Sequence, residues 1–167
     1  MNITESYLWR AELWMLITLL SYFLMNGAQI FETAVLVPKW TANPPETFSL
    51  LVNKKGVGLK LFWIILHSLH ELTFILAIAF CWKIIPIRNG LLIIFAIHFA
   101  MRVWTLSYFA TNIIEFQKVA EGLSSTTDVV KRVNLWQILN YIRVAVFVAL
   151  SIGLIPLLLK LSNIKNH

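Results

Sequence analysis

The sequence is poor in charged residues and in cysteine, and both shortages exclude whole classes of protein. Only 13% of its 167 residues are Asp, Glu, Lys or Arg, against about 25% in soluble globular domains. The single cysteine, Cys81, excludes a disulfide framework and a cysteine-rich zinc or iron–sulfur site. No nucleotide-binding, P-loop or haem-attachment motif occurs, so the sequence gives no sign of chemistry that depends on those groups.

Apolar residues are abundant instead, and they indicate a membrane protein. They make up 59% of the chain, and mean hydropathy is +0.75. A soluble domain of this size cannot hide so much apolar surface from water, which excludes a water-soluble enzyme. The net charge of +6 comes from scattered Lys and Arg residues without a basic run. Such a charge favours contact with anionic membrane lipids and gives no ground for nucleic-acid binding. We expect an integral protein of the plasma (inner) membrane of a bacterium.

Four apolar stretches are long enough to cross a membrane as helices, which takes about 20 residues. We place these spans at about 8–37, 57–82, 89–117 and 133–159. The chain therefore predicts an all-α fold, an antiparallel four-helix transmembrane bundle, formed by a single domain over residues 1–167.

The segments between the spans define a topology. Pro38 follows the first span, and a short amphipathic helix is expected near 45–53. An even number of spans places both termini on the side of the 83–89 loop. The longer loops, 38–56 and 118–132, then share the other side. Lys and Arg are spread almost evenly over the two sides, so the positive-inside rule leaves the orientation open.

Polar side chains inside the spans are the main functional signal. A charged group at mid-bilayer costs about 2.5–3.5 kcal/mol on insertion scales, so such groups normally face other helices and mark function. In each span they recur every three or four residues, which places them on one helix face. Counted from the long loops at 1.5 Å per residue, most fall in a layer about 10 Å thick, which suggests a pocket that opens toward those loops. The candidates for catalysis are His67, His70, Glu71, Arg102 and Arg143, and those for substrate binding are Asn26, Gln29, Glu32, His98, Glu115 and Asn140.

Whether these residues bind a metal or another cofactor stays open. Imidazole and carboxylate groups suit iron, zinc or copper. Di-iron bundles use Glu-x-x-His pairs, however, and none of His67, His70 and His98 has a glutamate three residues before it. The spacing of His67 and Glu71 resembles part of a zinc-binding helix but lacks the second histidine of His-Glu-x-x-His. A proton relay and a structural network of interhelical hydrogen bonds are the alternatives.

The two arginines inside the spans need partners, because an arginine side chain keeps its charge. Glu71 lies at the expected depth of Arg102 and Arg143, and Glu32 and Glu115 lie nearer the mouth. Structural ion pairs are one interpretation. The other is that one arginine binds an anionic or enolate oxygen of a ligand.

Three of the spans contain short motifs that carry a family resemblance. The first span ends in Gly27…Phe31-Glu32…Val37-Pro38, the third contains Arg102…Tyr108-Phe109…Ile113-Ile114, and the last contains Trp136-x-x-Leu139-Asn140-x-x-Arg143. These motifs resemble the anthrone-oxygenase-like family of small four-helix integral membrane proteins. The resemblance implies a four-helix membrane fold and, by analogy with fungal members, oxidation of a phenolic anthrone without a required cofactor.

Three functions fit the polar layer. The first is a membrane enzyme, an oxidoreductase or isomerase, that acts on a hydrophobic aromatic or isoprenoid-like molecule by proton abstraction or oxidation. His67 or His70 would be the general base, Glu71 would orient it, and Arg102 or Arg143 would stabilise negative charge on oxygen.

The second function is a small transporter or proton-coupled carrier, and the third is a structural or accessory membrane subunit. Few polar residues lie between His98 and the 83–89 loop, which favours a dead-end pocket and hence the enzyme. Membrane lipids and a hydrophobic small molecule are the expected partners, and homo-oligomer formation stays open.

Overall fold

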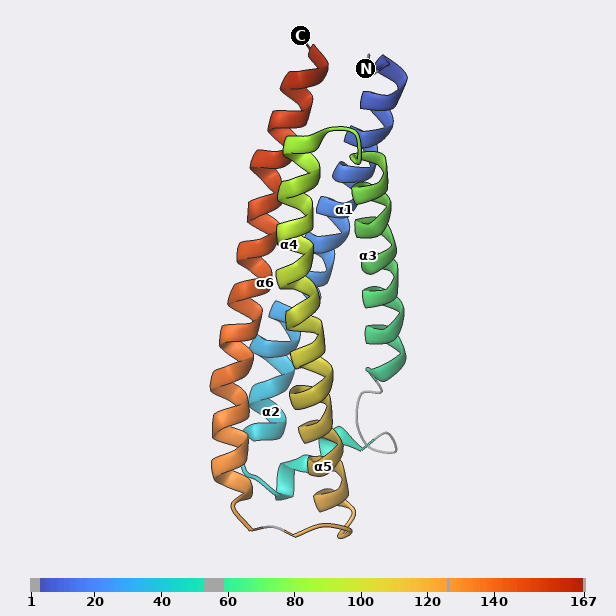
Figure 1. Ribbon diagram of the computed structural model, residues 1–167. Coiled ribbons are helices and arrows are strands. Elements are labelled where there is room, and N and C mark those ends of the chain that lie inside the picture. Colours follow the sequence, from blue (N-terminus) through green and yellow to red (C-terminus); the bar gives the residue numbers. More distant parts are fainter. Residues whose placement is uncertain (1–3, 53–58, 126, 167) are drawn as a thin grey trace. The chain divides into compact units, whose positions relative to one another are not determined.

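The structure is a computed structural model that describes residues 4–52, 59–125 and 127–166, and these residues form helices and no strand (Figure 1). The α-helices are α1 (Glu5–Phe31), α2 (Val37–Thr41), α3 (Lys60–Phe80), α4 (Ile85–Trp104), α5 (Thr111–Ala120) and α6 (Val129–Asn166). Three further helical segments are the π-helices η1 (Glu32–Leu36) and η3 (Thr105–Ala110) and the 3-10 helix η2 (Glu46–Leu51).

Four helical stretches are long and apolar enough to cross a membrane, judged by length and composition. They are Glu5–Thr41, Lys60–Phe80, Ile85–Ala120 and Val129–Lys165. Each overlaps one expected span, so the prediction of an all-helical chain with four long apolar helices is confirmed. The start of the expected second span at 57–58 and the end of the loop before it, at 53–56, lie outside the described residues.

The first stretch continues past Pro38, where we expected the helix to end. Proline has no N–H group, and its ring clashes with the carbonyl group one turn earlier in an α-helix. Here η1 precedes it, and the Val37 N–H bonds to the carbonyl oxygen of Glu32, five residues back. This wider turn makes room for the ring. Pro38 then lies in the first turn of α2, where a missing N–H costs least.

The expected short helix after the first stretch is present as η2. Phe48 is fully buried, whereas Glu46 and Ser49 are exposed, so this helix is two-sided. It differs from the expectation in being a 3-10 helix, a form that proteins use in short pieces.

Helix α3 buries polar side chains and exposes apolar ones. His67, His70 and Thr73 are buried, while Leu61 and Leu69 are 66% and 53% exposed. A helix that lies on a soluble protein shows the opposite pattern. The pattern of α3 is typical of a helix that packs through a polar face in apolar surroundings.

The chain divides into two compact units. The first unit comprises Met1–Asn26, Ile64–Phe99 and Val146–His167. The second unit comprises Gly27–Trp63 and Ala100–Ala145. Each unit has its own core and its own group of buried polar side chains, and each is described by itself.

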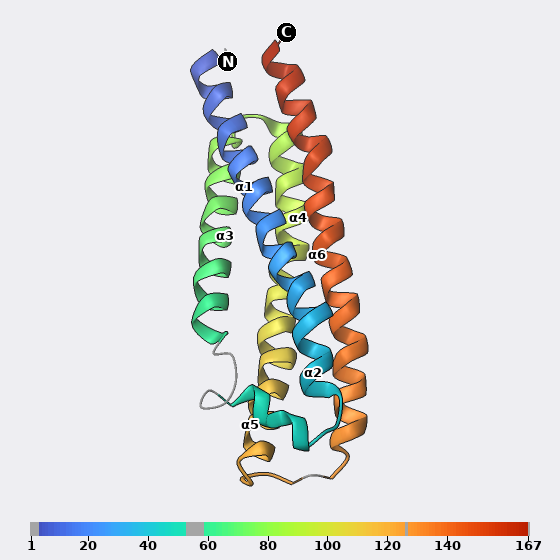
Figure 2. The same cartoon turned by 180° about the vertical axis from the view of Figure 1, so that it is seen from behind.

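In the first unit, parts of α1, α3, α4 and α6 pack together. A Cβ atom at Gly90 would lie 2.6 Å from the Cδ2 atom of Leu157, so glycine lets α6 approach α4 closely. The start of α1 and the end of α6 lie side by side in this unit (Figures 1 and 2). Lys165 forms an ion pair with Glu12 there, and the Lys83 N–H donates to the Tyr7 hydroxyl at 3.1 Å.

In the second unit, aromatic rings pack with valines such as Val37 and Val133 to form the core. The rings of Phe48 and Phe116 lie 5.0 Å apart, as do those of Trp40 and Trp136. The side-chain N–H of Gln117 donates to the carbonyl oxygen of Leu51 at 2.7 Å and so ties η2 to α5. These contacts hold η2 against α5 and hold α2 against α6, the helix that bears the buried arginine described below.

Candidate functional site

The eleven predicted site residues fall into both units. The first unit contains Asn26, His67, His70, Glu71 and His98, and the second contains Gln29, Glu32, Arg102, Glu115, Asn140 and Arg143. Within each unit the structure brings several of them together with polar residues that the sequence analysis did not select.

A hydrogen-bonded chain of three side chains runs through the first unit. The Tyr22 hydroxyl lies 2.9 Å from Nδ1 of His98. Nε2 of His98 lies 3.1 Å from Oε1 of Glu71. Tyr22 and His98 are fully buried, whereas the Glu71 side chain is 26% exposed. The chain therefore leads from the interior of the unit toward its surface.

With Glu71 ionised and the imidazole of His98 neutral, the chemistry of the three groups sets the direction of these bonds. An ionised carboxylate only accepts hydrogen bonds, so His98 donates its Nε2–H to Glu71. Nδ1 of a neutral imidazole is then an acceptor, and the Tyr22 O–H donates to it. A hydroxyl, a base and an orienting carboxylate in this order form the arrangement that activates hydroxyl groups in many enzymes.

His70 lies beside this chain and is held by hydroxyl groups. Its Nδ1 atom lies 3.1 Å from the Ser21 hydroxyl, which lies 3.0 Å from the Thr73 hydroxyl. The His70 ring centroid is 4.3 Å from that of Tyr22 and 5.1 Å from that of His98. His67 is buried one turn earlier. The catalytic roles that we assigned to His67 and His70 stay predictions.

Asn26 follows Tyr22 by one helical turn and is buried as well. Its amide nitrogen donates to the Ser151 hydroxyl at 2.8 Å and to the Phe147 carbonyl oxygen at 3.3 Å. Its amide oxygen has no hydrogen-bond partner among the described residues. A buried acceptor without a partner requires an explanation, such as a bound water or a ligand.

Tyr22 and the hydroxyl groups around it were not among the predicted site residues. Thr18, Tyr22 and Asn26 are spaced by four residues, so they lie on one helix face. That spacing could have identified Tyr22. A tyrosine in an apolar helix usually serves packing or lies at the membrane interface, so its residue type alone does not mark a site.

Arg143 is the centre of the polar group in the second unit. Its Nη2 atom donates to the Asn140 side-chain oxygen at 2.6 Å, and the Asn140 amide nitrogen donates to the Thr33 hydroxyl at 3.0 Å. Its guanidinium group lies over the Phe109 ring, 4.3 Å from the centroid. Arg143 is 7% exposed, and its Nε atom has no hydrogen-bond partner among the described residues.

Both π-helices contribute to the surroundings of Arg143. Thr33 belongs to η1 and Phe109 to η3. A π-helical turn inserts one extra residue into a helix and is often found at functional sites. Phe109 of η3 contacts the Arg143 guanidinium group directly. Thr33 of η1 acts indirectly, because it holds Asn140, which accepts a hydrogen bond from Arg143.

The other candidates in the second unit have different surroundings. Glu32 accepts a hydrogen bond from the Trp63 indole N–H at 3.3 Å. Glu32 and Arg102 both lie near enough to Arg143 for their charges to act on its guanidinium group. Gln29 is buried. Glu115 pairs instead with Lys118 at 2.7 Å, with both side chains partly exposed.

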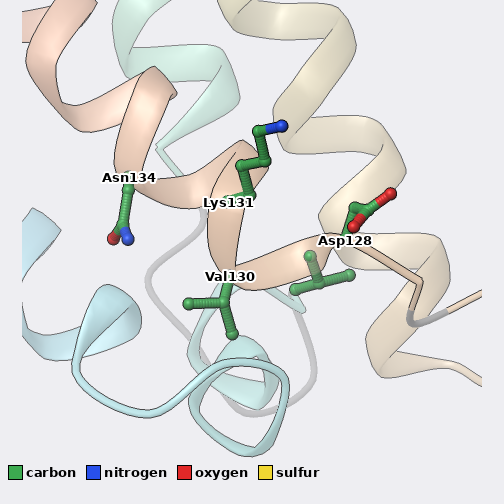
Figure 3. A pocket seen from close by; sticks show the side chains of 5 residues that line it. Asp128, Val130, Lys131 and Asn134 are labelled. Carbon is green, nitrogen blue, oxygen red and sulfur yellow. The ribbon is translucent and has the colours of Figure 1, made fainter.

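Neither of two surface hollows includes a predicted site residue. The hollow in Figure 3 has a volume of about 510 Å³ and lies at the start of α6, where Asp128, Val129, Val130, Lys131 and Asn134 line it. Another is lined by Glu5, Ser6, Trp9, Arg10 and Lys165. The expected pocket around the polar layer stays a prediction.

The described residues contain no group of three or more His, Cys, Asp or Glu side chains that could hold a metal ion. Cys81 lies in the turn between α3 and α4, and burial raises the pKa of its thiol to about 12. A thiol with such a pKa stays protonated near neutral pH and is a poor nucleophile and metal ligand.

Comparison with known proteins found no relative of this chain. The chain matches no protein-family model, no curated protein and no solved structure. The functional interpretation therefore depends on the geometry of the chain itself.

Proposed function

We propose that the chain is an integral membrane protein whose four apolar helices form an antiparallel transmembrane bundle. The lengths of the four helices support this proposal. So does α3, which exposes apolar side chains such as Leu61 and Leu69 and buries its histidines. A bacterial plasma membrane as its location, and membrane lipids as its partners, stay predictions.

We further propose that the protein is an enzyme that removes a proton from a hydrophobic small molecule. The hydrogen-bonded chain from Tyr22 through His98 to Glu71 carries this proposal. As the Tyr22 oxygen takes a proton from the substrate, its own proton passes to Nδ1 of His98. The carboxylate of Glu71 orients the imidazole and stabilises the positive charge that forms on it.

Asn26 supports a substrate position next to Tyr22. Its amide oxygen is buried, lacks a partner among the described residues and lies on the same helix face as the Tyr22 hydroxyl. A substrate hydroxyl group can donate to that oxygen. A hydroxylated aromatic or isoprenoid-like molecule has this chemistry, and removal of a proton from a carbon next to the hydroxylated one, by the Tyr22 oxygen, is the first step of an isomerisation or an oxidation.

Hydrogen exchange at carbon tests the proposal without knowledge of the substrate. An enolate or phenolate picks up hydrogen from solvent at carbon, so the purified protein in lipid nanodiscs is incubated in D₂O with a hydrophobic extract of the expressing cells. Mass spectrometry then detects compounds that keep deuterium after return to H₂O. We expect the wild-type protein to label a compound, and His98→Gln and Tyr22→Phe to slow the labelling about 100-fold or more.

Tyr7→Phe is the matched control, because it removes a hydroxyl from the same helix at a site outside the hydrogen-bonded chain. It should label the compound at the wild-type rate. If wild-type protein labels nothing above empty nanodiscs, or if the His98 and Tyr22 variants label normally, the enzyme proposal is wrong.

A proton-coupled carrier is the second candidate. The observation that favours it is that both ring nitrogens of His98 are engaged while Glu71 is partly exposed, as in a path for protons. Reconstituted liposomes with a pH-sensitive dye distinguish the two functions. Proton flux that Glu71→Gln abolishes, without carbon exchange in the D₂O experiment, would favour the carrier.

The resemblance to the anthrone-oxygenase-like family stays a proposal about the substrate class. It would make the substrate a phenolic aromatic compound, which agrees with a base that acts on an acidic hydroxyl or C–H group. A role as a structural or accessory membrane subunit stays an alternative, and the formation of a homo-oligomer stays a prediction.

A further inference from the structure

A buried arginine with a free hydrogen-bond donor is rare in proteins. The guanidinium group has five N–H donors in one plane and no acceptor, and a buried donor without a partner costs about as much as a lost hydrogen bond. Arg143 is only 7% exposed, yet its Nε atom has no hydrogen-bond partner among the described residues. Something that accepts a hydrogen bond is expected at this position.

The position of the guanidinium plane is fixed from two directions. Phe109 lies against its face at 4.3 Å. The Asn140 side-chain oxygen holds Nη2 at 2.6 Å, and Asn140 is itself held by Thr33. A planar group fixed in this way presents its remaining N–H groups in a set direction, so Arg143 is pre-organised for an acceptor.

The nearby carboxylate does not fill this role. The charge of Glu32 acts on Arg143, but no ion pair in direct contact joins the two among the residues that the structure describes. The Oε1 atom of Glu32 is bonded to Trp63 instead. The second charge that acts on Arg143, that of Arg102, is positive and strengthens the preference for an anion.

The surroundings of Arg143 indicate what kind of molecule carries the acceptor. The ring centroids of Trp104 and Trp136 lie 5.0 Å and 5.6 Å from that of Phe109, so the guanidinium group borders an aromatic cluster. A small hydrated anion would lose its water on entering such surroundings. An acidic group on a hydrophobic molecule would bring its own apolar part to these rings.

We infer that Arg143 is the anchor of a binding site for a hydrophobic molecule with one acidic oxygen group, a carboxylate or a phenolate. Its Nε–H donates to that oxygen while Phe109 and Asn140 hold the guanidinium plane. The site uses residues of the second unit only, so the inference does not rest on the chain of Tyr22, His98 and Glu71.

Binding of laurate and 2-naphthoate tests this site and separates an aliphatic from an aromatic source of the acidic group. The full-length protein is placed in phosphatidylcholine nanodiscs, which contain no anionic lipid, and tryptophan fluorescence is titrated against empty nanodiscs. We expect at least one of the two acids to bind about tenfold or more tightly than its uncharged counterpart, dodecanol or 2-naphthalenemethanol. Equal binding of acid and alcohol in both pairs would overturn the inference.

Arg143→Gln should lower the affinity for the acid about tenfold or more, because it removes the charge and the Nε–H donor. Arg132→Gln is the matched control, since Arg132 lies on the same helix, donates to Asn112 and lies over the Phe116 ring, but is only half-buried. It should bind the acid as the wild type does. Normal binding by Arg143→Gln would contradict the inference.

Arg143→Lys keeps the test decisive if the glutamine variant does not fold, as judged by circular dichroism. Lysine retains a positive charge but cannot present a planar Nε–H from above Phe109. We expect this variant to keep some preference for the acid over the alcohol and to bind the acid at least threefold more weakly than the wild type. Unchanged affinity would overturn the role of the guanidinium group.

Discussion

Tyr22 and His98 show how much a single buried polar group can depend on its neighbour. Both are fully buried, and the hydroxyl of one supplies the hydrogen bond to Nδ1 of the other. A buried acceptor that loses its donor costs about 1–3 kcal/mol, more than the bond itself contributes. The pair is therefore a stability feature as well as the core of the proposed chemistry.

Tyr22→Phe should lower the free energy of unfolding by about 1–3 kcal/mol, because Nδ1 of His98 remains buried without its donor. Thermal unfolding in detergent measures the loss. Tyr7→Phe should cost less than about 0.5 kcal/mol, since the Tyr7 hydroxyl is exposed and water can replace its partner. An equal loss of unfolding free energy in the two variants would show that the buried bond between Tyr22 and His98 stabilises the fold no more than an exposed bond does.

At the scale of single residues, the sequence predicted some site residues and missed others for a physical reason. Asn26, His70 and His98 were selected because a polar side chain in an apolar helix seeks the interior, and all three are buried. Tyr22 was missed because a tyrosine side chain suits both apolar and polar surroundings, so the residue type alone does not predict whether it is buried. The contact between Glu71 and His98 on another helix depends on tertiary packing, which the sequence does not show.

At the scale of the helices, the long apolar stretches were predictable and the π-turns were not. A stretch of apolar residues longer than about 20 predicts a helix whatever its neighbours do. A π-turn arises from one extra residue that tertiary packing absorbs, and no apolar spacing marks it. The sequence analysis therefore ended the first helix at Pro38, whereas η1 lets the helix continue to Thr41.

The π-turn η3 leads to a prediction about deletions. Removing Leu106, an exposed residue of η3, should restore a regular α-helix and keep the faces of the flanking helices aligned. Removing Ile93, an exposed residue of regular α4, should instead rotate one part of that helix by about 100° against the other.

Thermal unfolding followed by circular dichroism compares the two deletions. The Leu106 deletion should unfold close to the wild-type temperature, and the Ile93 deletion well below it or not cooperatively. If the Leu106 deletion is the more damaging of the two, η3 does not hold a single extra residue.

At the scale of the whole chain, the number of apolar helices was predictable from the sequence, and the contacts among the polar groups were not. Helix number follows from composition and length alone. We predicted from depth along each helix that most of the polar residues lie in one layer, with Glu32 and Glu115 nearer its mouth, and this layer stays a prediction. The structure shows which of the eleven site residues belong to each of the two compact units. Depth along a helix does not decide which helix faces which, because that depends on side-chain packing around the full circumference.

The membrane topology gives a prediction at this scale. An antiparallel arrangement of four spans places Ser49 and Ser125 on the same side of the membrane, opposite a tag at the C-terminus. Both serines are exposed, so Ser49→Cys and Ser125→Cys should react alike with a membrane-impermeant maleimide added to intact cells. If one variant reacts and the other does not, or if either reacts from the side of the tag, the four-span topology is wrong.

Cys81 is the only native thiol in the chain, so its reactivity sets the background signal of that labelling experiment. Burial raises the pKa of its thiol from its ordinary value to about 12. The folded protein therefore holds this proton at neutral pH, and its thiolate fraction grows only as the pH rises toward 12. Wild-type protein should stay unlabelled at pH 7.5 and become labelled after denaturation.

The tautomer of His98 tests the central claim of this account most directly, because Tyr22 can give its proton only to an unprotonated Nδ1. Nitrogen NMR of the full-length protein in nanodiscs, with ¹⁵N-labelled histidine and His98→Gln to assign the signals, distinguishes the two ring nitrogens. We predict a neutral ring with hydrogen on Nε2, facing Glu71, and an Nδ1 signal that shifts in Tyr22→Phe. Hydrogen on Nδ1, or an Nδ1 signal that is unchanged by Tyr22→Phe, would contradict the proposed proton path.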